Sequence, residues 1–292
     1  MFTPDQYQLI DFGDGRRLER FAGLRLDRPC PAVEDVARAD PDAWDEVDAR
    51  FERGDGEEGR WSCRGELPEC WSITHGPITL ELRRTAFGHL GVFPEQAANW
   101  DWITERLAQS PRPAKVLNLF AYTGGSTLAA AACGAEVVHV DAARNTIDRA
   151  RRNAELSGMA ERPIRWIAED AMKFVKRELK RGNRYDAVIL DPPSYGHGPR
   201  GEVWRLSTHL PRLLRLCGEL TAGRRGFMLL TCHTPGYDPP RLKEIMADAL
   251  GEAERGTVAA GESTIRAATG RPLPGGAVVR WESRLADGLA RR

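Results

Sequence analysis

The sequence predicts an α/β fold, in which a mostly parallel, seven-stranded sheet with helices on both faces follows a smaller β-rich α+β domain. From Lys115 onward, apolar strand-like segments alternate with helical segments, which indicates a parallel sheet covered on both faces. Residues 1–110 hold 13 basic and 22 acidic residues, a net charge of −9, whereas residues 111–292 hold 29 and 20, a net charge of +9. We therefore predict a small N-terminal domain at residues 1–100 and a larger domain at residues 101–292.

The N-terminal domain is expected to consist mainly of short strands separated by turns that contain glycine. The strands predicted there are Tyr7–Phe12, Leu18–Leu26, Trp71–Thr74 and Ile78–Leu82. Residues 31–53 are predicted as an acidic helix, because apolar side chains such as Val33 and Trp44 recur at helical spacing.

The second domain has a regular alternation of elements. Its strands are predicted at Val116–Phe120, Glu136–Val140, Ile164–Ala168, Ala187–Leu190 and Gly226–Thr231, and a closing antiparallel hairpin at Thr257–Ala268 and Ala277–Trp281. Its helices are predicted at Ser126–Cys133, Ala143–Leu156, Ala171–Arg181, Val203–Leu220 and Pro240–Leu250.

The composition is typical of a protein with a packed core, since 41% of the residues are hydrophobic and 29% are charged. No apolar run approaches the roughly 20 residues of a membrane span, and the N-terminus lacks the pattern of a secretory signal. The six cysteines form neither a C-x-x-C pair nor a zinc-type cluster with histidine. We therefore expect reduced thiols, a cytoplasmic location, no membrane association and no metal.

In parallel sheets, ligands bind beyond the carboxyl ends of the strands. The first strand end is Asn118–Gly125, where the adjacent Gly124 and Gly125 let the backbone approach a ligand and the next helix offers N–H groups to a carboxylate. The segment lacks the G-x-G-x-x-G of nicotinamide enzymes, which argues against a dehydrogenase.

Acidic residues follow the next two strands. Asp141 lies about 20 residues beyond the first loop, where a carboxylate can accept hydrogen bonds from both hydroxyls of a ribose. Asp170 ends the third strand and is placed to accept an adenine amine. Both residues also precede helices, so a helix N-cap is the alternative for each.

The fourth strand ends in Asp191-Pro192-Pro193-Ser194-Tyr195-Gly196. Two prolines fix φ and stiffen this loop, so that the Asp191 side chain and the Pro192 carbonyl are held in place toward a substrate. Asp-Pro-Pro alone is a weak signal, but it is a strong one when it follows a strand at this spacing after Asp141 and Asp170.

The segments VLNLFAYTGG, VDAARNTIDRARRNAELSG, AED and DPPSYG together resemble the bacterial large-subunit (23S) rRNA cytosine-C5 methyltransferase group of class I S-adenosylmethionine-dependent methyltransferases. The similarity covers residues 90–235, and Gly88–Gln96 (GHLGVFPEQ) is similar to the strand-and-Gln segment ahead of that group's cofactor domain. Residues 1–85 match nothing specific, and the RNA-binding module often found at that group's N-terminus is not recognisable.

The resemblance implies a Rossmann-like methyltransferase domain, S-adenosyl-L-methionine as cofactor, and RNA as partner, with rRNA favoured. It implies that Asn118–Gly125 hold the methionine part of the cofactor, Asp141 the ribose and Asp170 the adenine, and that Gln96 reaches the pocket. The cofactor-binding residues expected are Gln96, Asn118, Phe120, Tyr122, Thr123, Gly124, Gly125, Asp141, Ala142, Asp170 and Asp191.

Two routes of methyl transfer stay open. The cysteine motif of the family corresponds to Thr231-Cys232-His233, and C5 of cytosine becomes nucleophilic only after a thiolate, here that of Cys232, adds to C6. Alternatively, Cys232 is a small buried residue, and Asp191 with the Pro192 carbonyl orients an exocyclic amine while Tyr195 stacks on the base. The catalytic residues expected are Asp191, Pro192 and Cys232, and the substrate-binding residues are Pro193, Ser194 and Tyr195.

Methylation of an RNA base, with rRNA cytosine C5 favoured, is therefore the first hypothesis. The second is methylation of a small molecule or a protein, with the N-terminal domain as a substrate lid. The third is a cofactor-binding interaction module without catalysis, against which the intact Asp191-Pro192-Pro193 argues.

His197 is the one histidine singled out as a proton carrier. A basic helix stripe either binds phosphates or is an ordinary solvated face; it consists of Lys173, Lys176, Arg177, Lys180, Arg181 and Arg184.

Overall fold

The computed structural model describes residues 1–54, 56, 58–251 and 256–283. The chain forms two compact units: Met1–Ala98 with Thr264–Gly275 is unit 1, and Asn99–Ser263 with Gly276–Arg292 is unit 2. Residues 264–275, which lie within the predicted second domain, thus belong to unit 1. The functional division at residue 100 stays a prediction.

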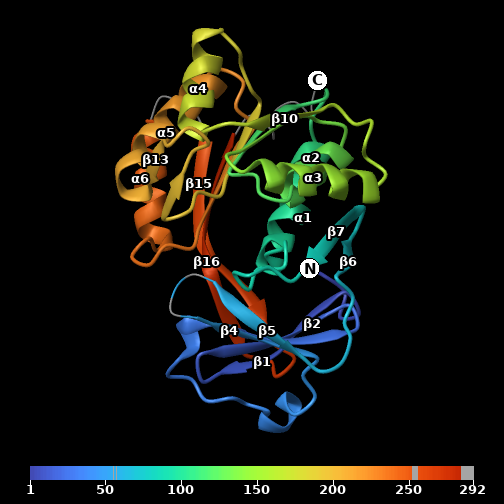
Figure 1. Cartoon of the computed structure of the whole chain (residues 1–292). Helices are drawn as coiled ribbons and strands as arrows, with labels where there is room; N and C mark the ends of the chain where they lie inside the picture. The colour runs from blue at the N-terminus through green and yellow to red at the C-terminus, as the bar shows by residue number, and fades with distance from the viewer. Residues whose placement is uncertain (55, 57, 252–255, 284–292) are drawn as a thin grey trace. The chain divides into compact units, whose positions relative to one another are not determined.

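Unit 1 contains a five-stranded sheet in the order β1-β2-β3-β4-β5 (Figure 1). Its strands are β1 (Tyr7–Gly13), β2 (Arg16–Phe21), β3 (Leu24–Pro29), β4 (Ala49–Arg53) and β5 (Gly59–Cys63). The strand predicted at Leu18–Leu26 is in fact two, because Ala22 has φ 53° and turns the chain between β2 and β3. The second predicted hairpin is confirmed as β6 (Cys70–His75) and β7 (Ile78–Arg83).

The helix predicted over residues 31–53 is wrong. This segment forms two short 3-10 turns, η1 (Pro31–Val33) and η2 (Pro41–Trp44), and then the strand β4. The buried carboxylate of Asp11 on β1 accepts hydrogen bonds from the backbone N–H of Ala39 and of Asp40 and from the Trp44 indole at 3.1 Å. These tertiary contacts, together with the two prolines, outweigh the helical spacing of the apolar residues.

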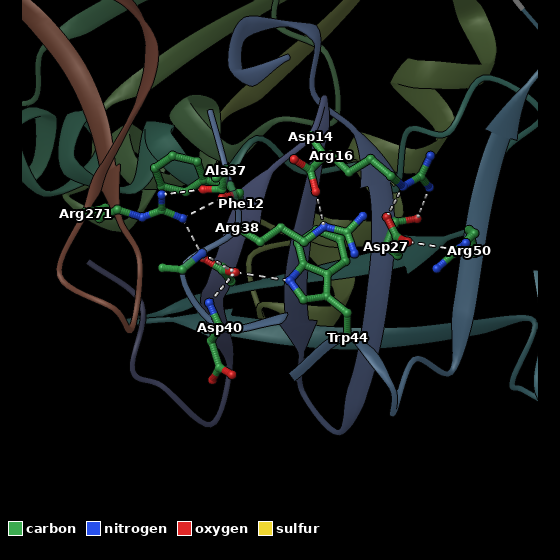
Figure 2. A network of polar contacts seen from close by, with 12 residues as sticks. Phe12, Asp14, Arg16, Asp27, Ala37, Arg38, Asp40, Trp44, Arg50 and Arg271 are labelled. Atoms are coloured by element: carbon green, nitrogen blue, oxygen red, sulfur yellow. Dashed lines mark hydrogen bonds and ion pairs between the residues drawn. The ribbon is translucent and has the colours of Figure 1, made fainter. Parts of the chain in front are cut away.

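Arg271, in the turn between the last two strands, binds N-terminal residues within unit 1 (Figure 2). Its guanidinium donates to Asp11 Oδ1 at 2.7 Å and to the Ala37 carbonyl at 2.8 Å, and lies 4.4 Å from the centre of the Phe12 ring. Burial acts to raise the pKa of Asp11, but the hydrogen bonds from the Asp40 N–H and the Trp44 indole, with a smaller contribution from Arg271, hold it below its ordinary value. Asp11 is therefore a buried anion with a full set of donors.

Unit 2 contains the predicted seven-stranded sheet, in the order β10-β9-β8-β11-β14-β16-β15. The strands are β8 (Lys115–Leu119), β9 (Glu136–Asp141), β10 (Ile164–Ala168), β11 (Ala187–Leu190), β14 (Phe227–Cys232), β15 (Gly256–Arg266) and β16 (Pro272–Ser283). The strands from β10 to β14 are parallel, and β16 runs antiparallel to β14, which confirms the predicted fold class.

Helices cover both faces of this sheet (Figure 1). The helices on one face are α1 (Ala97–Ala108, preceded by the 3-10 turn η3, Pro94–Gln96), α2 (Gly125–Ala132) and α3 (Arg144–Leu156). Those on the other face are α4 (Ala171–Lys180), α5 (Leu206–Thr221) and α6 (Pro239–Leu250), whose apolar side chains form the main core with the sheet. The start predicted for α5 is wrong, because Val203–Arg205 is a strand, β13, that pairs with β12 (Tyr195–His197).

Candidate active site

The carboxyl ends of four adjacent strands of unit 2 meet at one edge of the sheet. Leu119 of β8 pairs with Val140 of β9 and with Leu190 of β11, and Leu190 pairs with Leu230 of β14. Because the four strands are parallel and in register, the segments that follow them lie side by side. The backbone segments that carry the candidate residues after these strands are therefore adjacent.

The loop between β8 and α2 has an unusual backbone. Phe120 and Tyr122 have φ values of 56° and 48°, and Gly124 has φ 90°. Left-handed φ is costly for a residue with a Cβ, and such conformations cluster at ligand-binding sites. A Cβ on Gly125 would overlap the ring of Trp100, so this position requires glycine. Gly124 and Gly125 therefore allow this loop to pack closely against Ala150 of α3 and Trp100 of α1.

Asp141 at the end of β9 holds this loop in place. Its Oδ2 accepts a hydrogen bond from the Tyr122 backbone N–H at 2.9 Å, and its Oδ1 accepts from the Ala143 N–H at 2.9 Å. Burial raises the pKa of Asp141, and these backbone donors oppose the rise. Each carboxylate oxygen has a second acceptor site, so Asp141 can also accept from a ribose hydroxyl.

Asn118 lies in a buried hydrogen-bonded chain beneath the loop. Its Nδ2 donates to Thr127 Oγ1 at 2.9 Å, and this hydroxyl is 2.9 Å from Nδ1 of His139. Burial lowers the pKa of His139 to about 3, so the imidazole is neutral at physiological pH. The Asn153 side chain of α3 donates to the Thr123 carbonyl at 2.9 Å. Sequence reasoning missed these supporting contacts.

Asp170 is the N-cap of α4, which is one of the two roles that the sequence predicts for it. Its Oδ1 accepts from the Lys173 backbone N–H at 2.8 Å, and the side chain is half-buried. A contact between Asp170 and an adenine stays a prediction. Ala142 is half-buried directly after β9. Gln96 belongs to unit 1, at the end of η3, so its contact with the cofactor pocket also stays a prediction.

Asp191 follows β11 and is held by the neighbouring strand. Thr231 Oγ1 of β14 donates to Asp191 Oδ1 at 2.6 Å. His233 Nε2 lies 3.7 Å from the same oxygen, and the two side chains form an ion pair when the imidazole is protonated. The sequence pointed to Thr231 and His233 only as neighbours of Cys232, although their position at the end of β14, the strand next to β11, was a usable signal. His197 lies instead on the β12 strand, against Tyr195.

The loop after Asp191 is anchored along its length. Pro192 is buried, whereas Pro193, Ser194 and Tyr195 are exposed. The Pro193 carbonyl accepts a hydrogen bond from the Trp204 indole at 2.7 Å, and Ser194 Oγ lies 2.7 Å from Thr234 Oγ1. The residues expected to meet a substrate thus lie on a fixed segment beside the β14 end.

Cys232 is the last residue of β14, and its exposed fraction is only 1%. Side chains alternate between the two faces of a strand, so Cys232 lies on the face opposite to Thr231. It belongs to the core cluster that includes Leu242 and Met246 of α6. This placement favours the alternative in which Cys232 is a small buried residue.

Carboxylates pair with three of the six residues of the basic stripe, which begins on α4 and extends past its end to Arg184. Lys173 pairs with Glu202 at 2.8 Å, Arg177 with Glu169 at 2.6 Å and Arg181 with Glu178 at 3.5 Å. These pairs favour a solvated helix face over a phosphate site. No helix in the described ranges has the length and apolar character needed to cross a membrane. Within the same ranges there is no group of three or more His, Cys, Asp or Glu side chains suited to a metal.

Comparison with known proteins agrees with this geometry. Residues 47–252 match the model of a family described as S-adenosylmethionine-dependent methyltransferase. A crystal structure of the SAM-dependent methyltransferase from Agrobacterium tumefaciens is similar at 40% identity and a TM-score of 0.91, over 96% of this chain and 91% of that one.

Two curated relatives are both named ribosomal RNA large subunit methyltransferase I. That of Aeromonas hydrophila is 34% identical over 143 residues, and that of Photobacterium profundum 39% identical over 143 residues. Each alignment covers 48% of this chain and 35% of the relative, so the chain spans about a third of the relatives' length. The extent of the family match and the likeness to the Agrobacterium structure establish that the chain belongs to the S-adenosylmethionine-dependent methyltransferase family.

Proposed function

We propose that this protein methylates a base in ribosomal RNA. The observation that carries the proposal is the side-by-side placement of the cofactor loop after β8 and the Asp191-Pro192 segment after β11, the strands of which pair directly. The names of the two curated relatives support an rRNA substrate.

S-adenosyl-L-methionine fits the loop between β8 and α2. No described side chain caps the N-terminus of α2, so its backbone N–H groups are placed to receive the carboxylate of the methionine part. Asp141, which binds the Tyr122 N–H of this loop, is placed for the ribose. When bound, the cofactor supplies an electrophilic methyl group on a sulfonium.

Asp191 and its neighbours then orient the acceptor. The bond from Thr231 fixes one carboxylate oxygen, and because a carboxylate has several acceptor sites, Asp191 can also accept a hydrogen bond from an amine on the base edge. The Pro192 carbonyl is a second fixed acceptor, because the pyrrolidine ring of Pro193 restricts the backbone beside it. We propose that His233, 3.7 Å from Asp191, takes up the proton that the base releases on methylation.

Cytosine C5 is the receiving atom that the family resemblance favours. It requires the Cys232 thiolate to add to C6 of the base, and therefore requires the side chain to leave the core cluster in which it is buried. The burial of Cys232 on the face opposite to Thr231 supports a second candidate, methylation of an exocyclic amine, which needs no covalent intermediate.

The test is transfer of a labelled methyl group to rRNA from cells that lack the gene, followed by identification of the methylated nucleoside. Asp191→Asn should lower kcat by about 10²- to 10³-fold, while the affinity for S-adenosylhomocysteine should change little. Unchanged transfer by Asp191→Asn, or transfer to protein but to no RNA, would overturn the proposal.

A second variant distinguishes methylation of cytosine C5 from methylation of an exocyclic amine. If cytosine C5 is the target, Cys232→Ala should abolish transfer, and RNA containing 5-fluorocytosine should trap a covalent complex with the wild-type enzyme. Full transfer by Cys232→Ala, with an N-methylated nucleoside as product, would support the amine route and refute the thiolate one. Cys217→Ala is the matched control, because Cys217 is equally buried but lies within α5.

A further inference from the structure

We infer that one face of the β12–β13 hairpin holds an unpaired nucleotide of the RNA strand beside the nucleotide that is methylated. This inference rests on the proposed function, since it names the form of the substrate and the surface that binds it. The hairpin begins at Tyr195, four positions after Asp191, so it continues directly from the segment expected to meet the target base.

The pairing of the two strands determines which side chains share a face. Tyr195 is opposite Arg205, and His197 is opposite Val203. Because side chains alternate along a strand, these four residues lie on one face, which we call the outer face, and all four are exposed. Tyr195 is 52% exposed and Val203 44%. Large exposed apolar side chains gathered on one short hairpin indicate a binding surface.

The opposite face of the hairpin anchors it to the sheet. It carries Gly196 and Trp204, and Trp204 is buried. The Trp204 indole donates to the Pro193 carbonyl at 2.7 Å, and its ring centre lies 4.9 Å from that of Phe120 in the cofactor loop. Trp204 therefore connects the hairpin to both loops of the candidate active site.

Two further contacts close the hairpin at its ends. The Leu206 N–H donates to the Ser194 carbonyl at 3.0 Å, and the Gly198 N–H donates to the Glu202 carbonyl at 2.7 Å. Lys173 of α4 pairs with the Glu202 side chain at 2.8 Å. An aromatic residue on such a support loses little conformational freedom on binding, which favours its use as a recognition surface.

The chemistry of the outer face matches an unpaired nucleotide. The Tyr195 and His197 rings meet edge to face at 5.1 Å and 89°, so each ring holds the other in its orientation, and a base can stack on one of the two exposed rings. The Arg205 guanidinium has no carboxylate partner in the described part of the chain, and guanidinium binds phosphate and stacks on bases. A duplex would hide the base faces, and therefore the occupant is single-stranded.

The experiment measures the binding of a fluorescent ten-nucleotide RNA of mixed sequence, as a single strand and as a duplex, to the full chain. Tyr195→Ala should weaken binding of the single strand about tenfold, and Tyr195→Phe should retain most of it. Arg205→Ala should weaken binding. It should also reduce the slope of the logarithm of the binding constant against the logarithm of the salt concentration by about one, which corresponds to one lost phosphate contact. The matched controls are Phe87→Ala, which removes an aromatic residue that is 47% exposed on unit 1, and Arg165→Ala on β10.

The inference is overturned if Tyr195→Ala and Arg205→Ala bind the single strand as the wild type does, or if the duplex binds as tightly as the single strand. Equal affinity of wild type and variants for S-adenosylhomocysteine verifies that the site is folded. Methyl transfer to rRNA is measured with the same proteins. If the variants methylate rRNA with the KM of the wild type, the role of the hairpin surface is refuted but the proposed function is not. If the wild type binds the RNA but methylates no rRNA, the proposed function is refuted but the binding surface is not.

Discussion

The buried histidine beneath the cofactor loop predicts a specific loss of stability in acid. His139 is fully buried on β9, and burial, with a smaller contribution from Arg151, lowers its pKa from 6.5 to about 3. In the unfolded chain the imidazole regains its ordinary pKa, so the unfolded state binds a proton first as the pH falls. The contribution of neutral His139 to the free energy of unfolding is therefore fully present above pH 6.5 and is lost progressively between pH 6.5 and 3.

The magnitude follows from the two pKa values. Between pH 7.5 and pH 5 the unfolded state gains about 2 kcal/mol over the folded state from this one group, and the slope near pH 5 is about 1.4 kcal/mol per pH unit. His139→Gln removes the titrating group. The variant should therefore lose about 2 kcal/mol less than the wild type over this interval, whatever its stability at pH 7.5.

Hydrogen exchange of peptides that contain β9 provides the assay, because it reports the opening free energy of unit 2 alone. The wild type, His139→Gln and His197→Gln are compared at pH 7.5 and at pH 5 after correction for intrinsic exchange. His197 is the control because its side chain is exposed. If the wild type and His139→Gln lose the same stability between the two pH values, the interpretation of His139 as a buried neutral group is refuted.

Three other changes test single contacts. Gly125→Ala should weaken S-adenosylhomocysteine binding measured by calorimetry and lower unfolding free energy by about 1–3 kcal/mol, since the new methyl group overlaps the Trp100 ring; full retention of both would contradict this. Arg271→Ala removes a donor from the buried Asp11 and should cost about 2–3 kcal/mol in urea unfolding, and a neutral result would mean that the remaining donors suffice. Asp170→Ala should cost about 1 kcal/mol as a lost N-cap, and an additional loss of cofactor affinity would support the adenine contact.

The regular part of the fold was predictable because its elements are determined locally. In unit 2 the strands β8, β9 and β11 are largely apolar and buried, and their predicted bounds differ from the observed ones by at most one residue. The helix predicted at residues 31–53 was wrong because the conformation of this segment depends on Asp11, which lies far upstream in the sequence. Backbone N–H groups of the segment donate to the Asp11 carboxylate and not to carbonyl groups of a helix. The predicted start of α5 at Val203 was wrong because Val203–Arg205 pairs with Tyr195–His197 as a strand and does not continue the helix.

The candidate site divides in the same way. Gly124, Gly125 and Asp141 were predictable because the need for glycine and for a strand-end carboxylate is visible in the local pattern. The roles of Asn153 and Trp204 were not predictable, because they include hydrogen bonds to backbone carbonyls that are 30 and 11 positions away, respectively. Such bonds leave no spacing signal, since the backbone acceptor can belong to any residue type.

The choice between the two catalytic interpretations depends on a periodicity that the sequence does contain. Strand β14 alternates Met228, Leu230 and Cys232 into the core that it shares with α5 and α6, so Thr231 must lie on the other face. Asp191 receives its hydrogen bond from Thr231, which places its carboxylate with that face and not with the Cys232 sulfur. A mechanism that uses both residues must therefore move the Cys232 side chain out of the core, whereas a mechanism that uses Asp191 with Thr231 needs no such movement. The same alternation makes Cys232→Ala the most decisive substitution in the chain, because its effect on transfer reports whether that movement occurs.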